Sequence, residues 1–140
     1  MKSTFFRFVA EIRPSSSYYK LPKGDITNFT ELIDSGNIFD PKTGRLTIKD
    51  EQQNGIYVFQ ISALKSAPYG KSRRGLIVIY KNQDLSQQIY ESDGENASMM
   101  NSLFTFHLKK GDEVKLKNYE GDYSIYVTDS FPLIFTGYKV

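Results

Sequence analysis

The sequence predicts an all-β fold, an antiparallel sandwich of about ten short strands in two sheets. Tyr and Phe each occur ten times in 140 residues. Together with Val, Ile and Thr, they are the side chains that strands favour. Short segments of alternating apolar and polar residues recur between turn residues, a spacing typical of sandwiches and barrels. The strands are too short for βαβ units, so two packed antiparallel sheets are the natural arrangement.

The first half of the chain is expected to hold four strands. The first, residues 5–12, alternates and places on one face Phe6, Phe8, Ala10 and Ile12. Residues 14–25 contain three Ser, two Tyr and Gly24 and are expected to form a long loop. Two further strands are expected at residues 28–33 and 45–49. The clearest strand, residues 56–63, places on one face Tyr57, Phe59, Ile61 and Ala63.

The residue types of two connections in this half predict a turn and a loop. In residues 40–44, Asp40 caps the turn, Pro41 fixes φ at the second position, and Gly44 can adopt a positive φ. Residues 50–54 are polar and lead to Gly55, so we expect a loop there.

The second half is expected to hold six strands and no helix. Residues 76–81 are nearly all apolar, as in a buried strand, and residues 85–91 suit an edge strand. Residues 103–108 point Phe104, Phe106 and Leu108 inward, and a tight turn at Gly111-Asp112 then leads into residues 113–117. The last two strands are expected at residues 123–127 and 133–140.

Composition limits the partners and the chemistry. The 140 residues are enough for one domain, residues 1–140, and strand-like alternation begins so early that we expect a domain excised from a longer chain. The absence of Cys excludes disulfides, Cys-ligated zinc and thiol catalysis. The net charge of +2 is too small to indicate a nucleic-acid or membrane surface. We therefore expect no direct nucleic-acid binding and no membrane insertion.

Four segments, taken in order, resemble the C1q-domain family, a sister of the tumour necrosis factor (TNF) fold. They are residues 34–48, Gly55-Ile56-Tyr57-Val58-Phe59, residues 108–116 and Phe135-Thr136-Gly137-Tyr138. The last three are similar to the family patterns Gly-x-Tyr-x-Phe, Leu-x-x-Gly-Asp-x-Val-x-Leu and Phe-x-Gly-aromatic. Each pattern is weak alone, but four in the right order are specific. The resemblance implies an antiparallel jelly roll, C1q/TNF-like, that assembles as a homotrimer and has no catalytic activity.

Departures from the family pattern indicate a divergent member. Leu46 stands where the family usually has Phe, Ile61 replaces an aromatic residue, and Lys139 lies at an apolar position. The link at residues 50–54 is longer than usual. None of these changes interrupts the alternation of core residues.

No catalytic constellation is evident, so we expect no enzyme. His107 is the single His and lies on the outward face of its strand, without a Ser or carboxylate partner nearby in the sequence. It is interpreted as a surface residue.

Calcium is the one metal that the sequence leaves open. Some C1q-domain proteins bind Ca²⁺ near the trimer axis through Asp residues that precede the Leu-x-x-Gly-Asp strand. Asp93 and Glu95 offer oxygen ligands in this region. However, Tyr90 and Ser98 occupy the positions where, counting back from Gly111, the family's aspartates are expected. We therefore expect a solvated turn and no cofactor, with Asp93 and Glu95 as the ligands if calcium binds.

The implied trimer requires apolar side chains that point away from the core of one sheet. In the strand around Tyr57, the alternation predicts two outward apolar residues, Ile56 and Val58. The resemblance places Ile77 and Ile79 inward, which implies that Val78 and Tyr80 also face outward. The alternative is that long loops cover both faces of the sandwich.

The leading interpretation is a secreted recognition head of innate immunity. Three domains would present loops to a protein, glycan or pathogen-surface ligand and gain avidity. The candidate ligand-binding residues lie in two long loops: Lys71, Arg73, Arg74, Tyr18, Tyr19 and Lys20. A basic cluster of this kind is most often simply a solvated loop.

Two other functions share the implied fold. One is an intracellular, cytoplasmic protein-interaction and oligomerisation module, like the C1q-related domain of caprin-type RNA-granule proteins, which the lack of Cys suits. The other is a cytokine-like receptor ligand. The flanking sequence would separate the functions, because a collagen repeat indicates the secreted recognition head and a coiled coil with basic or Gln-rich tracts indicates the RNA-granule class.

Overall fold

The computed structural model describes residues 5–14, 18–65, 75–91, 98–119 and 125–140. This part of the chain contains thirteen strands, one short 3₁₀ helix and no α-helix, which confirms the predicted all-β class. The sequence prediction missed three short strands: β2 (Tyr18–Lys20), β3 (Gly24–Asp25) and β5 (Phe39–Asp40). The first two lie in the segment that was expected to be a continuous loop.

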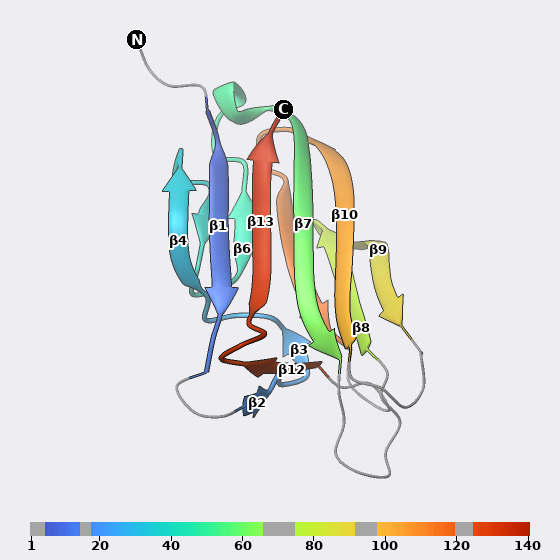
Figure 1. Ribbon diagram of the computed structural model, residues 1–140. Helices are drawn as coiled ribbons and strands as arrows, with labels where there is room; N and C mark the ends of the chain where they lie inside the picture. The colour runs from blue at the N-terminus through green and yellow to red at the C-terminus, as the bar shows by residue number, and fades with distance from the viewer. Residues whose placement is uncertain (1–4, 15–17, 66–74, 92–97, 120–124) are drawn as a thin grey trace.

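The larger sheet has seven strands, all paired antiparallel. Across Figure 1 it runs through β4 (Thr30–Ser35), β1 (Arg7–Ile12), β13 (Leu133–Lys139), β7 (Gly55–Lys65) and β10 (Ser98–Leu108). β10 pairs with β7 along its whole length. β12 (Ile125–Thr128) pairs with the end of β7 and carries β2 on its other side.

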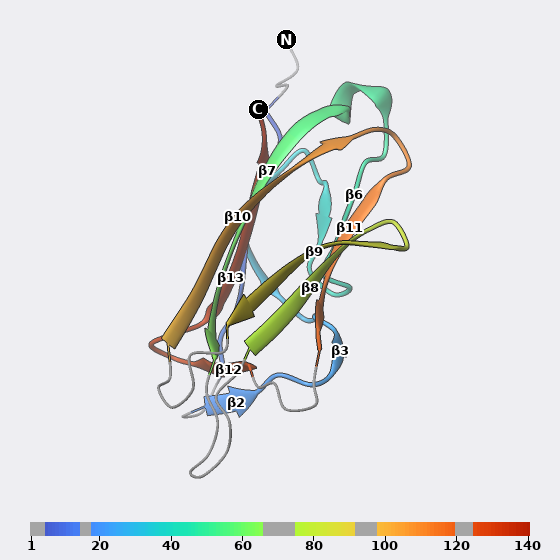
Figure 2. The ribbon, with the colours of Figure 1, turned by 90° about the vertical axis from the view of Figure 1, so that its right-hand side faces the viewer.

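The smaller sheet has six strands and covers the inner face of the larger one. Its order is β5, β6 (Arg45–Thr47), β11 (Glu113–Asn118), β8 (Gly75–Lys81) and β9 (Asp84–Glu91), with β3 also paired to β11. Figure 2 shows the two sheets as separate layers. β9 lies at the edge of its sheet, as predicted.

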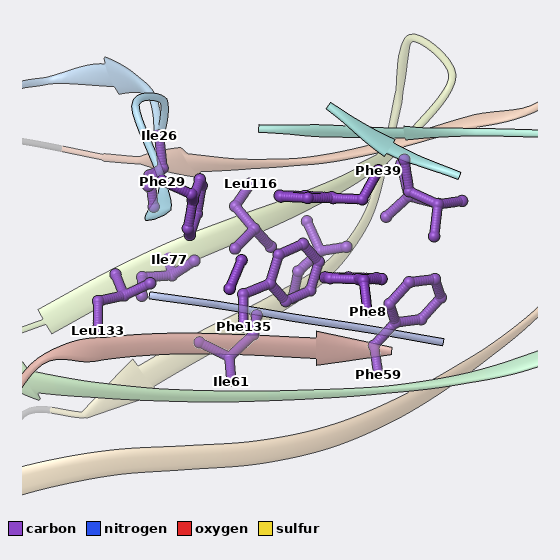
Figure 3. Close-up of a cluster of buried hydrophobic side chains, with 14 of the residues drawn as sticks. Phe8, Ile26, Phe29, Phe39, Phe59, Ile61, Ile77, Leu116, Leu133 and Phe135 are labelled. Carbon is purple, nitrogen blue, oxygen red and sulfur yellow. The ribbon is translucent and has the colours of Figure 1, made fainter. Parts of the chain in front are cut away.

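The core between the sheets is rich in Phe. The rings of Phe8 and Phe39 stack with centroids 4.4 Å apart, and Phe135 meets Phe8 edge-on at 5.0 Å. Figure 3 shows these rings and Phe59 among the aliphatic side chains of both sheets. The predicted inward faces are confirmed for β1 and β7, whose core residues are buried: Phe6, Phe8, Ala10, Ile12, Tyr57, Phe59, Ile61 and Ala63. Phe106 of β10 is only half-buried and packs at the margin of the core.

Residues 50–54 form a turn of 3₁₀ helix, η1 (Glu51–Gln53), where a loop was expected. The Asp50 carboxylate accepts a hydrogen bond from Gln52 N at 3.0 Å, and the Gln53 side chain accepts one from Lys49 N at 2.6 Å. Together with the bond from Asp50 N to Gln53, this arrangement is a capping box. The hydroxyl of buried Tyr57 donates to Gln53 O at 2.7 Å, so the helix is fastened to β7.

Candidate interaction surface

The outer face of the seven-stranded sheet is set by the alternation of β7. Because Tyr57 and Phe59 point into the core, Ile56 and Val58 point outward. Residues directly opposite one another on paired strands share a face. The register places His107 of β10 opposite Ile56, and Tyr138 of β13 opposite Val58. It also places Leu103 opposite Gln60 of β7 and Ile33 of β4 opposite Val9 of β1.

This outer face exposes large apolar side chains from four strands. We call the group the outer apolar face: Ile33, Ile56, Val58, Leu103 and Tyr138. Leu103 is 65% exposed, Ile56 49% and Tyr138 45%. In an antiparallel sheet with one face in water, these positions normally carry polar residues. Exposed apolar groups gathered on one sheet face are a feature of interaction sites.

Two of the four predicted trimer residues lie on the outer apolar face, and two do not. Ile56 and Val58 are on it, whereas Val78 and Tyr80 belong to β8 in the other sheet, on the opposite side of the sandwich. Val78 is only 2% exposed, so this residue is already covered within one chain, and its place in a trimer interface stays a prediction. Alternation along a strand separates inside from outside, but it does not reveal which sheet the strand joins.

Sequence reasoning missed Leu103, Tyr138 and Ile33. The signal for Leu103 was present, because it precedes inward Phe104 on a predicted strand and so has the same outward parity as His107. The side of His107 was predicted correctly, since this residue is exposed. Its backbone carbonyl accepts a hydrogen bond from Lys81 Nζ at 3.3 Å.

The predicted ligand-binding residues are only partly described. Lys71, Arg73 and Arg74 lie outside the described residues. Tyr18, Tyr19 and Lys20 form β2, a strand paired with β12 and not the expected loop, at the end of the sandwich opposite the C-terminus (Figure 1). Lys20 is exposed there.

The two candidate calcium ligands, Asp93 and Glu95, also lie outside the described residues. Within the described ranges, no three His, Asp or Glu side chains come together in a way that could hold a metal ion. No helix in the same ranges has the length and apolar character needed to cross a membrane.

The fold and this surface define a class: an antiparallel jelly-roll interaction domain whose larger sheet exposes an apolar face. The sequence matches the C1q domain over residues 8–140. The chain therefore belongs to the C1q-domain family, as the four motifs predicted.

Solved structures share the fold at low sequence identity. The globular domain of zebrafish complement 1qA protein is 18% identical, with 96% of this chain and 97% of that chain covered and a TM-score of 0.68. Murine APRIL at pH 5.0 is 14% identical, with 96% and 99% covered and a TM-score of 0.67. Eiger TNF from S. frugiperda is 13% identical, with 97% and 92% covered and a TM-score of 0.67. A comparison with curated protein sequences found no significant match.

Proposed function

We propose that this chain is a non-enzymatic recognition head that assembles as a homotrimer and binds an extracellular protein or glycan ligand with avidity. The observation that carries the proposal is the outer apolar face. Fully burying a Leu or Ile side chain contributes about 1.5–3 kcal/mol relative to leaving it exposed. Ile56, at 49% exposed, and Leu103, at 65%, still have about half and about two thirds of that burial to gain. A second copy of the chain, packed on this face, would supply it.

The two edges of the seven-stranded sheet support the same assembly. β4, at one edge, carries the acidic residues Glu31 and Asp34, and the charge of Asp34 on an edge strand discourages pairing with another chain. β10, at the other edge, has the sequence SMMNSLFTFHL, with no Asp, Glu, Lys or Arg. Among the described strands it pairs only with β7. A long uncharged edge strand is an aggregation hazard unless it is covered, so we place the neighbouring subunit against β10.

The predicted ligand-binding residues support a binding end on each subunit. The loop that carries Lys71, Arg73 and Arg74 begins where β7 ends, and there Lys65 pairs with Ile125 of β12. β12 in turn pairs with β2, which contains Lys20. Lys65, the last described residue before that segment, and Lys20 therefore both lie beside β12 at one end of the sandwich. Three such ends in one trimer would give avidity from individually weak contacts.

The test is the mass in solution of the chain and of two matched variants. Light scattering is expected to give three times 16.1 kDa for the unmodified chain. Leu103→Glu places a charge on the outer apolar face, on the edge strand β10 against which the neighbouring subunit is proposed to pack, so we expect a folded monomer. Leu85→Glu is the control, because Leu85 is 51% exposed on β9 of the other sheet, and this variant should remain trimeric. A monodisperse monomer for the unmodified chain, or identical masses for the two variants, would refute the proposal.

A further inference from the structure

The six-stranded sheet has a hollow on its solvent side that the proposed trimer does not use. Its volume is about 490 Å³, and it is open to solvent. Strands β6, β11 and β8, which lie side by side in Figure 2, contribute most of its walls. The residues that matter here are Arg45, Tyr80, Gln83, Glu113, Lys115 and Lys117.

Tyr80 lines this hollow, and two ammonium groups lie close to its ring. The ring centroid is 5.7 Å from Lys115 Nζ and 5.9 Å from Lys117 Nζ. The two lysines are on the same side of β11, because Val114, Leu116 and Asn118 between and beside them are buried. The hollow therefore combines an aromatic ring with positive charge.

One cation beside Tyr80 lies outside the ion pairs of the hollow. Arg45 forms ion pairs with Asp25 at 3.5 Å and Glu113 at 3.3 Å, and Lys115 pairs with Asp25 at 3.4 Å. Among the described residues, Lys117 forms no ion pair with a carboxylate, and its ammonium lies 5.9 Å from the centroid of the Tyr80 ring. An acidic group of a ligand would give Lys117 a partner.

We propose that this hollow binds an anionic sugar, that is, a saccharide ring that carries one carboxylate or sulfate group. The sugar's C–H groups would pack on the electron-rich face of Tyr80. Its acidic group would accept a charge-assisted hydrogen bond from the Lys117 ammonium. The Gln83 side-chain amide would form hydrogen bonds with the sugar hydroxyls. The inference rests on the proposed function only in naming a ligand class for the recognition head. The hollow lies within one chain, on the opposite side of the sandwich from the outer apolar face.

The experiment is a calorimetric and NMR titration with four small probes. Glucuronate carries the carboxylate, and N-acetylglucosamine 6-sulfate carries the sulfate. Glucose lacks the charge, and acetate lacks the ring. We expect the two anionic sugars to bind at least ~tenfold more tightly than glucose or acetate, because a hydrogen bond to a charged group is stronger than one between neutral groups. If only one of the two binds, its acidic group identifies the ligand. Equal binding of glucose, or no binding of either anionic sugar, would overturn the inference.

Matched variants then locate the site. Lys117→Gln and Tyr80→Leu should each weaken binding about tenfold, whereas Lys117→Arg and Tyr80→Phe should retain it. Lys42→Gln, at an exposed lysine away from the hollow, is the control for overall charge. Unchanged binding by Lys117→Gln would overturn the inference. Light scattering on the same samples separates the two proposals, because a trimer that binds no anionic sugar contradicts only this one. A monomer that binds contradicts only the trimer.

Discussion

Lys139 shows how a charged residue occupies a position where the family has an apolar one. Its aliphatic stem covers Gly55, where a Cβ atom would come within 2.6 Å of Lys139 Cε. Its ammonium donates to Gln52 O at 3.1 Å and lies 5.6 Å from the ring of Phe6. The long link at residues 50–54 supplies that carbonyl through η1. Two departures from the family pattern therefore form one contact, in which a lysine packs with its stem and keeps its charge at the surface.

The surroundings of Gly137 explain why the closing motif requires a glycine. A Cβ atom here would lie 2.5 Å from the ring of Phe8 and 2.9 Å from the ring of Phe59. Gly137→Ala would gain about 0.5–1 kcal/mol from lower chain entropy. The overpacking costs about 1–3 kcal/mol, so the free energy of unfolding should fall. Chemical denaturation measures this difference.

The matched control is Thr136→Ala on the same strand. Thr136 lies opposite Gln60 on the outer face, so its truncation should change the stability by less than about 0.5 kcal/mol. If Gly137→Ala proves as stable as the unmodified chain, the packing of Phe8 and Phe59 against the β13 backbone is wrong.

At the scale of elements, the edge strand β4 carries a carboxylate that resists ionisation. Desolvation raises the pKa of Glu31 to about 7, and its hydrogen bond with Asp34 and the nearby charges of Asp34 and Asp40 add to the shift. The folded state thus favours protonated Glu31. The resulting stability is fully present below pH 4.5, the usual pKa of Glu, and is lost as the pH rises through 7. Above that pH, ionised Glu31 weakens the fold.

Glu31→Gln should therefore stabilise the protein above pH 7 and have little effect near pH 4. Gln keeps a hydrogen-bond donor for Asp34 but cannot ionise. Because Glu31 is largely exposed, solvent screening should limit the gain to about 1 kcal/mol or less. Thermal melts of both proteins across this pH range test the prediction. An equal difference in melting temperature at all pH values would contradict it.

The strands that could be predicted from sequence are those in which large apolar residues alternate, such as β1 and β7. β3 could not be predicted, because its two residues are a strand only through pairing with Lys117 and Asn118 of β11. The strand expected at residues 28–33 begins later, at Thr30, since Asn28 adopts a left-handed φ of 62°. The capping box of η1 was readable, because Asp50 precedes Gln53 by three residues. It was overlooked within a polar loop.

For the whole molecule, the two sheets face different partners in the proposed assembly. The outer apolar face and the uncharged β10 edge belong to the seven-stranded sheet, and the hollow around Tyr80 belongs to the six-stranded sheet. The sequence could indicate which residues point outward. It could not assign Ile56 and Val78 to opposite sides, because that depends on how the chain crosses between the sheets after β7. This crossing decides which exposed residues can meet in one interface.

The thermal stability of the assembly should depend on protein concentration. If the trimer unfolds to separate chains, dilution favours the unfolded state by mass action. A roughly hundredfold dilution lowers the chemical potential of each dissolved species by RT ln 100, or about 2.7 kcal/mol, and dissociation turns one dissolved trimer into three chains. The melting temperature of the unmodified chain should therefore fall on dilution. Leu103→Glu should melt at a lower temperature that does not change with concentration, whereas Leu85→Glu should keep the dependence. A concentration-independent melting temperature for the unmodified chain would mean that the outer apolar face does not contribute to its stability through self-association.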